Sequence, residues 1–141
     1  MNASLRIVSG AGIAALLLAG CAGMSSTKTV NVSLSGTEQV PPVATAAKGS
    51  GSIVVNEDHT VSGSVTISGL APVAAHIHTG ARGANGPVAV GLTKSSDTVW
   101  VVPAGAKFND AQYAAFLKGD TYLNFHTPAH KGGEIRGQLQ P

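Results

Sequence analysis

The segment Val61-Ser62-Gly63-Ser64-Val65-Thr66-Ile67-Ser68 has an apolar residue or glycine at every second position and a hydroxyl side chain at each position between. Because successive side chains of a strand point to opposite faces, this pattern predicts a strand with one face buried in a core. The preceding run 51–55 is also typical of a strand, and Asn56-Glu57-Asp58-His59 resembles the turn of a hairpin. The two runs therefore predict a pair of antiparallel strands.

Similar short alternating runs, separated by turn residues, continue through most of the chain. One helix is predicted over residues 110–118, where Asn109 is a typical N-cap and Gln112 stands at the position that completes a capping box. The apolar face of this helix is formed by Tyr113, Phe116 and Leu117. Further strands are predicted at residues 30–34, 74–79, 88–93, 98–102, 121–127 and 134–139.

About eight short strands and one short helix predict an all-β domain, either an antiparallel β-sandwich or a flattened Greek-key barrel. Residues 38–43 are expected to be extended without regular pairing, because Pro41 and Pro42 have no backbone N–H to donate. Trp100 is expected to pack in the core or at a sheet edge.

The N-terminal residues resemble a bacterial lipoprotein leader. Arg6 precedes a short apolar run that ends in Leu18-Ala19-Gly20-Cys21, which is similar to a lipobox. The resemblance implies a signal peptide over 1–20 and a lipidated Cys21, which begins a tether over 21–28. The length that remains after cleavage fits a single domain over 29–141. Ala22 follows the cysteine, and in a diderm bacterium the absence of Asp there favours the outer membrane. An ordinary secretory signal with a coincidental cysteine is the alternative.

Charge and cysteine content limit the classes of function. Without Arg6, eight of the nine basic residues remain beside seven acidic ones, so the net charge is near +1. This balance does not favour nucleic-acid binding, and the sequence has no basic run or aromatic stacking platform. Cys21 is the single cysteine, so no internal disulfide can form. We expect a protein of the bacterial cell envelope, held at the membrane by its lipid and facing the periplasm or the cell surface.

Four of the five histidines lie in two predicted strands and the turn after the second. His76 and His78 share one face of their strand and His126 lies on the corresponding face of the other, each opposite the apolar side. If these strands are neighbours, three imidazoles can converge under the glycine-rich loop 79–87 and hold a metal ion. Imidazole ligation without thiolate suits copper(II) or zinc, and copper binds more tightly in the general divalent series.

Simpler interpretations stand beside the metal site. A strand histidine is ordinarily a solvated polar residue, and His59 is most simply a turn residue. His130, four residues after His126, is either a fourth ligand or uninvolved. On the last strand Glu134, Arg136 and Gln138 alternate, which favours a solvated face or a cross-strand ion pair.

Several ordered motifs together resemble the CHRD domain, the repeat first recognised in chordin and also present alone in bacterial secreted proteins. They are Leu34-Ser35-Gly36-Thr37-Glu38-Gln39-Val40-Pro41-Pro42-Val43, Ala74-Ala75-His76-Ile77-His78, Asn124-Phe125-His126-Thr127 and Gly133-Glu134-Ile135-Arg136-Gly137-Gln138-Leu139. The resemblance covers about 29–139 and implies a β-sandwich, with recurring histidines at His76, His78 and His126. It implies no settled activity, and at His130 related sequences more often carry Asn.

A more distant resemblance is to the copper/zinc superoxide dismutases, which also have an H-x-H strand, a glycine-containing loop and a later histidine that completes a copper site. The analogy implies copper at His76, His78 and His126, and an Arg136 that attracts an anion. The chain lacks the disulfide and the zinc-binding loop of that family.

Three functions follow, in order of preference. The first is a copper-binding module for storage, delivery or sensing; the second is a non-catalytic module that contacts an unknown protein or a glycan; the third is a superoxide dismutase-like enzyme. The sequence has no Ser-His-Asp arrangement, paired carboxylates or nucleotide motif, so hydrolase and kinase activities are unsupported.

Overall fold

The computed structural model describes residues 26–141, which form nine strands, a short 3-10 helix (Gly36–Glu38) and one α-helix, α1 (Asp110–Leu117). The predicted signal peptide, Cys21 and most of the predicted tether lie outside the described residues. The strands are β1 (Lys28–Ser35), β2 (Lys48–Val55), β3 (Val61–Ser68), β4 (Ala74–Thr79), β5 (Val88–Gly91), β6 (Thr93–Lys94), β7 (Val99–Val101), β8 (Thr121–His126) and β9 (Ile135–Leu139).

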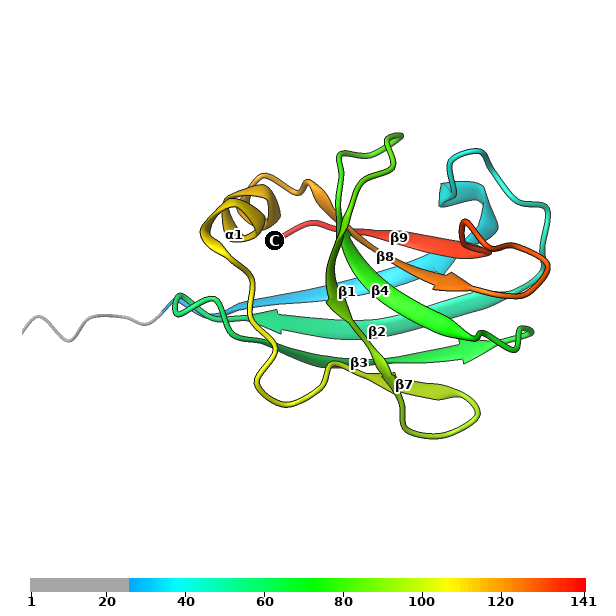
Figure 1. Cartoon of the computed structure of the whole chain (residues 1–141), viewed down its shortest axis with the longest axis horizontal. Coiled ribbons are helices and arrows are strands. Elements are labelled where there is room, and N and C mark those ends of the chain that lie inside the picture. The colour runs from blue at the N-terminus through cyan, green and yellow to red at the C-terminus, as the bar shows by residue number, and fades with distance from the viewer. Residues whose placement is uncertain (1–25) are drawn as a thin grey trace, which may run out of the picture.

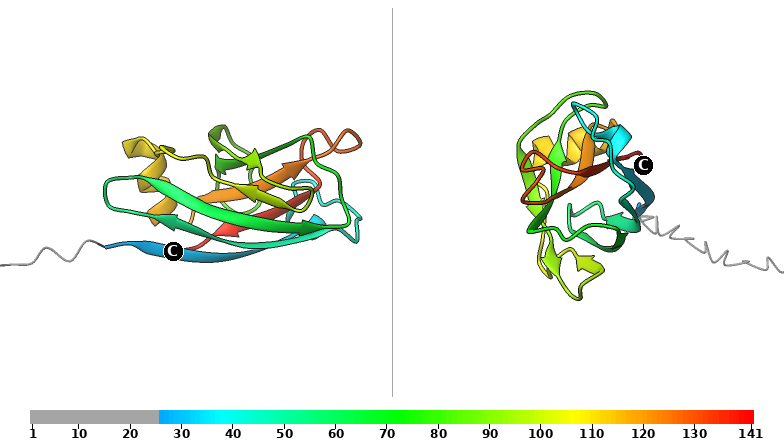
Figure 2. Two further views of the ribbon diagram at one scale, coloured as in Figure 1. Left: turned by 90° about the horizontal axis from the view of Figure 1, so that it is seen from below. Right: turned by 90° about the vertical axis from the view of Figure 1, so that its right-hand side faces the viewer.

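The strands pair in the order β5-β4-β8-β9-β1-β2-β3-β7-β6, and every pair is antiparallel. Strands β4, β8 and β9 lie over β1, β2 and β3, and the two layers meet where Ser35 of β1 pairs with Arg136 of β9 (Figures 1 and 2). On the other side the segment 88–94 pairs first with β4 as β5 and then with β7 as β6. The sheet is therefore a nearly closed, flattened all-β barrel, as the sequence predicted.

The strand predicted over 88–93 is divided in the structure. Leu92 separates β5 from β6, and its backbone N–H donates to the carbonyl of Ala75. The chain changes its pairing partner at this residue, so a run that is continuous in sequence belongs to two ladders. Nine strands result where about eight were expected.

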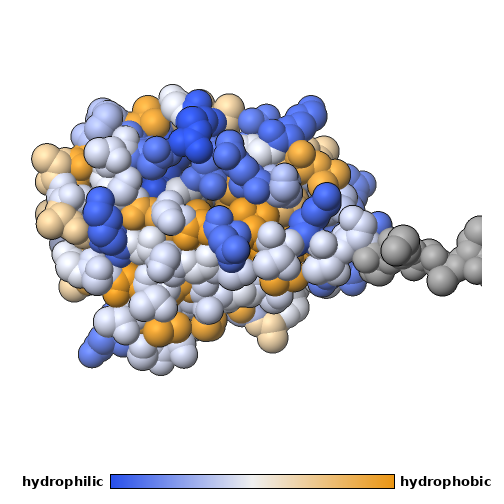
Figure 3. Space-filling view, turned by 180° about the vertical axis from the view of Figure 1, so that it is seen from behind, coloured by the Kyte–Doolittle hydropathy of each residue, from blue (hydrophilic) through white to orange (hydrophobic). Residues whose placement is uncertain are grey.

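Apolar side chains of the two layers meet in one core. In β4 and β8, Ile77, Leu123 and Phe125 are completely buried, and each alternates with a polar residue. The Trp100 ring lies edge-on to Phe125 with 5.8 Å between ring centroids, which confirms that Trp100 is a packing residue. Exposed apolar residues occur singly, and from behind the surface mixes polar and apolar side chains (Figure 3).

Helix α1 closes one end of the barrel and has the predicted capping box. The side chain of Asn109 accepts from the backbone of Gln112, and the side chain of Gln112 accepts from the backbone of Asn109. Phe116 is completely buried, whereas Leu117 is 48 % exposed. The prediction that Leu117 belongs to the apolar face was wrong, because this short helix contacts the core through Phe116 and the adjacent Tyr113. Among the described residues, no helix is long and apolar enough to cross a membrane.

The side of β4, β8 and β9 that faces away from the core is also buried. Tyr122, Asn124, Arg136 and Gln138 lie on this face, and none is more than 8 % exposed. The loop 80–87 folds over it, and its carbonyl groups accept hydrogen bonds from Arg136 and Gln138. The predicted solvated face or ion pair on the last strand was therefore wrong for Arg136 and Gln138, because a loop distant in sequence covers them.

Candidate metal centre

The register of β4 and β8 brings the predicted histidines together. Ala74 pairs with His126 and His76 pairs with Asn124, so His76 and His126 are diagonal neighbours across the two strands. His78 lies two residues further along β4, on the same face as His76. All three rings thus lie on one side of the sheet, opposite the side that carries Ala75 and Ile77.

The three rings are close enough to offer their nitrogens to one point. One nitrogen from each of His76, His78 and His126 lies within 4.8 Å of the other two. The Nδ1 of His76 and the Nε2 of His126 are 3.0 Å apart. Ring centroids are separated by 5.4 Å for the His76–His78 pair and by 4.9 Å for the His76–His126 pair.

Backbone carbonyls fix which nitrogen of two rings carries the proton. The Nδ1 of His78 lies 2.9 Å from the carbonyl oxygen of Gly86, and the Nδ1 of His126 lies 2.8 Å from that of Lys131. A carbonyl can only accept, so both Nδ1 atoms donate and both neutral rings have an unprotonated Nε2. This second hydrogen bond to a backbone group is the usual arrangement behind a metal-ligating histidine.

One of these free nitrogens has no hydrogen-bond partner among residues 26–141, although the Asn124 side chain acts on the same ring. His78 is 8 % exposed, and its Nε2 is buried without a hydrogen-bond partner among the described residues. The Nε2 of His126 faces the Nδ1 of His76, which must supply the proton between them. A metal ion bound here would replace that proton and satisfy the orphaned nitrogen of His78.

The surroundings of His76 and His78 favour the uncharged form of their imidazoles. Burial lowers the pKa of His76, and the nearby His126 and His78 lower it further. Burial also lowers the pKa of His78, an effect that the hydrogen bond to Gly86 and the nearby Asn124 side chain partly oppose. A metal requires the neutral ring, so these shifts favour the form that can bind.

Binding requires a small contraction of the cluster. Two nitrogens on opposite sides of an ion, each bonded at about 2.0–2.1 Å, are at most about 4.2 Å apart. The spread of up to 4.8 Å therefore needs to close by at least about 0.6 Å, and by more where the two bonds are not opposite. Rotation of a partly exposed ring such as His76 or His126 can supply a shift of this size.

The remaining predicted residues lie elsewhere. His130 is not part of the cluster in the described chain; its backbone closes a turn with Thr127. His59 is in the β2–β3 turn with φ +69° and stacks on Tyr113, in agreement with its interpretation as a turn residue. The carboxylate of Glu134 accepts hydrogen bonds from Thr45 and Thr127.

Sequence reasoning missed the residues that support the centre. The Tyr122 ring stacks on His78 with centroids 4.9 Å apart and planes 5° apart, and its hydroxyl accepts from the backbone of Gly86. The guanidinium of Arg136 lies 3.5 Å from the centroid of the same ring. The sequence did contain one indication that this face is covered, because Tyr122 is a large aromatic residue on the side of the strand that was expected to face solvent.

With the fold and the histidine cluster described, the comparison with known families decides the classification. The model of the CHRD domain matches residues 30–139, which is nearly the whole described domain. The chain belongs to the CHRD domain family. The family resemblance and the β-sandwich that it implied are thus confirmed, and the cluster of His76, His78 and His126 lies inside the CHRD domain. No curated protein and no solved structure matches the chain.

Proposed function

We propose that this CHRD-domain protein binds a transition-metal ion, with copper favoured over zinc, through His76, His78 and His126. The observation that carries the proposal is the orientation of the rings. The Nδ1 atoms of His78 and His126 each donate to a backbone carbonyl, and the Nε2 of His78 is buried without a hydrogen-bond partner in the described part of the chain. Leaving a buried polar atom unpaired costs about 1–3 kcal/mol, so a ligand at this nitrogen is favoured.

The donor set favours copper or zinc over hard cations. Three neutral imidazoles suit copper and zinc, whereas calcium and magnesium need oxygen ligands. Both carboxylate oxygens of Glu134, which precedes β9, accept hydrogen bonds from the hydroxyl groups of Thr45 and Thr127. Copper is preferred over zinc because it binds more tightly in the divalent series.

The proposed setting is the bacterial cell envelope. The lipobox-like sequence before Cys21 supports a lipid anchor, and Ala22 supports the outer membrane, with the domain facing the periplasm or the surface. A membrane-held copper site would serve storage, delivery or sensing of the ion, and delivery would require a protein partner. Radiolabelled palmitate incorporation that Cys21→Ser abolishes would support the anchor, and incorporation that persists would contradict it.

Metal titration tests the proposed site. We expect the purified chain to bind one equivalent of copper(II), measured by isothermal titration calorimetry, with Cys21→Ser in every protein so that no thiol competes. His76→Ala, His78→Ala and His126→Ala should each weaken binding at least tenfold, because two imidazoles hold the ion less tightly than three. His130→Ala is the matched control and should bind as the parent does. Absence of stoichiometric binding of both copper(II) and copper(I), or binding that the three substitutions leave unchanged, would refute the site.

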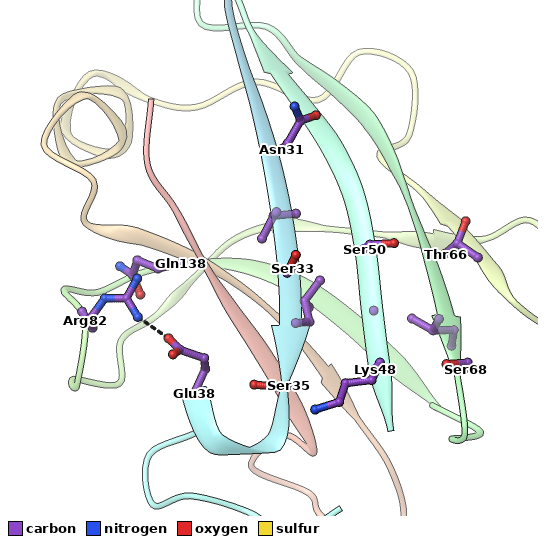
Figure 4. A pocket seen from close by; sticks show the side chains of 14 residues that line it. Asn31, Ser33, Ser35, Glu38, Lys48, Ser50, Thr66, Ser68, Arg82 and Gln138 are labelled. Carbon is purple, nitrogen blue, oxygen red and sulfur yellow. Dashed lines mark hydrogen bonds and ion pairs between the residues drawn. The ribbon is translucent and has the colours of Figure 1, made fainter. Parts of the chain in front are cut away.

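A second candidate function is a non-catalytic interaction module, favoured by a groove on the opposite layer. The groove has a volume of about 690 Å³, and small exposed hydroxyl residues form its floor. Ser33 pairs with Ser50 and Ser50 with Thr66, so their side chains form a row across β1, β2 and β3 (Figure 4). The ion pair of Arg82 with Glu38 lies at one edge. A polar floor of this kind suits the hydroxyl groups of a glycan.

The two functions are separated by different variants. Glycan binding should survive His76→Ala and be lost when Ser50→Lys fills the groove, whereas copper binding should show the reverse pattern. A glycan screen with no ligand for the parent chain would remove the second function. A superoxide dismutase-like activity would use the same three histidines. It is refuted if the copper-loaded chain dismutates superoxide no faster than free copper does.

A further inference from the structure

Arg136 places a buried positive charge beside the candidate metal centre. Its side chain comes from β9 and the residue is 1 % exposed. One terminal nitrogen donates to the carbonyl of Ala84 at 2.9 Å, and the other to the carbonyl of Ala81 at 3.1 Å and to Gln138 Oε1 at 3.1 Å. These acceptors are neutral, and within residues 26–141 Arg136 forms no ion pair with a carboxylate. A guanidinium does not deprotonate in proteins, so the charge is permanent.

The Tyr122 ring connects this charge to the histidines. Strand β8 lies between β4 and β9, and Tyr122 on β8 contacts His78 from the first and Arg136 from the second. The guanidinium carbon is 3.5 Å from the ring centroid of Tyr122, which in turn is 4.9 Å from that of His78. The charge is therefore at most 8.4 Å from the His78 ring.

The groups that would hold the ion carry no negative charge. All three ligands are neutral imidazoles, and the groups behind His78 and His126 are backbone carbonyls. The carboxylate of Glu134 bonds to hydroxyls and not to a ring. A bound metal thus adds its charge to a region that already contains the Arg136 cation. Glu38 offsets the charge of Arg136 only in part, because Glu38 forms an ion pair with Arg82.

We propose that Arg136 biases the three-histidine centre toward monovalent copper. The inference rests on the proposed function, because it needs a metal at His76, His78 and His126. Repulsion from Arg136 grows with the charge of the bound ion, so it penalises copper(II) more than copper(I). With an effective dielectric constant of about 20 and a separation of roughly 10 Å, one unit of metal charge changes the relative affinity on the order of tenfold.

Arg136 is also a positioning residue for the ligand His78. It holds the loop 80–87 by the carbonyls of Ala81 and Ala84, and the Gly86 carbonyl of the same loop fixes the His78 ring. A purely structural role would predict that loss of Arg136 weakens both oxidation states of copper equally. The charge effect predicts that the ratio of the two affinities changes.

The experiment measures both affinities on the same proteins. The chain with Cys21→Ser is titrated anaerobically with copper(I) against bicinchoninate, and with copper(II) against a chelator of known affinity. We expect copper(I) to bind more tightly than copper(II) in the parent. Arg136→Gln keeps an amide donor but has no charge. It should lower the ratio of copper(I) affinity to copper(II) affinity about tenfold. The reduction potential of the bound copper, measured by voltammetry, should then fall by about 59 mV.

Two matched variants complete the test. Arg136→Lys retains the charge and should keep the parent's preference even if both affinities weaken, and Glu134→Gln should not lower it. An unchanged affinity ratio in a folded Arg136→Gln protein would overturn the inference. A parent protein that binds copper(II) more tightly than copper(I) would also overturn it, and this measurement does not depend on whether the variant folds. Failure to bind either ion would instead remove the proposed function.

Discussion

The Nδ1 of His78 lies 2.9 Å from the carbonyl oxygen of Gly86, and this contact joins the candidate metal centre to the loop that covers it. The backbone N–H of the same Gly86 donates to the Tyr122 hydroxyl, and Tyr122 stacks on the His78 ring. Loop, aromatic ring and ligand thus form one closed set of contacts. A change in the loop is therefore expected to change metal binding, although the loop supplies no ligand itself.

Gly86→Ala is expected to displace the loop and weaken copper binding. A Cβ at this position would lie 1.7 Å from the carbonyl oxygen of Thr79, a backbone atom that cannot move aside cheaply. We expect a loss of about 1–3 kcal/mol in the free energy of unfolding and at least a roughly tenfold weaker copper affinity. Urea denaturation and copper titration measure the two effects.

Gly83→Ala in the same loop is the control for Gly86→Ala. Gly83 has φ +81°, but nothing lies within 4 Å of an added Cβ. The substitution should cost roughly 1–2 kcal/mol of backbone strain and leave copper affinity unchanged, because Gly83 does not contact His78. Equal copper affinities for the two variants would show that the loop does not position the ring.

Bound copper is expected to stabilise the fold. A ligand present at 100 times its dissociation constant raises the free energy of unfolding by about 2.7 kcal/mol if it binds only the folded state. We expect a corresponding rise in the melting temperature in differential scanning calorimetry, and a clearly smaller rise for His126→Ala, which binds copper more weakly. A melting temperature of the parent that copper leaves unchanged would argue against a site formed by folding.

The metal-free chain is expected to lose stability on mild acidification. Burial lowers the pKa of His76 and His78 in the folded protein, while the unfolded chain titrates near 6.5. Below about pH 6.5 the unfolded state therefore binds more protons, and stability falls as the pH decreases. The urea midpoint should be lower at pH 5.5 than at pH 7.5. The dependence should flatten when both residues are replaced by glutamine, and a parent midpoint that is constant with pH would contradict the prediction.

Phe116→Ala and Leu117→Ala are expected to differ sharply although the residues are adjacent. Phe116 is completely buried against the core and Leu117 is 48 % exposed. Phe116→Ala should cost about 3–5 kcal/mol, whereas Leu117→Ala should cost less than about 1 kcal/mol. Thermal unfolding of both variants measures the contrast. Comparable losses would mean that Leu117 has a packing role that its exposure does not reveal.

The alternation of apolar and polar residues was sufficient to predict most of the fold. In Val61–Ser68 and around Ile77, period-two patterns fixed which side chains enter the core, because a strand leaves only two faces. The helix was recognised from the capping box of Asn109 and Gln112, a local interaction that short sequences specify. Division of the strand at Leu92 was not predictable, because pairing partners depend on the whole barrel.

The three histidines of the site could be predicted from the sequence, but the residues that hold them in place could not. The face shared by His76 and His78 follows from their spacing, and His126 became a third member by assuming that its strand is a neighbour, which the register confirms. Arg136 was misinterpreted because a polar residue at an alternate position ordinarily faces water. Here the loop 80–87 replaces water, and nothing local to β9 encodes that contact.

The division of residues 88–94 between two ladders affects how readily the sheet can aggregate through its edges. Strands β5 and β6, which end the sheet, have only four and two residues. Each offers another chain too short a row of free backbone groups to act as a template for added strands. The pairing switch at Leu92 thus leaves sheet ends that a second copy of this protein can hardly extend, which disfavours edge-to-edge aggregation.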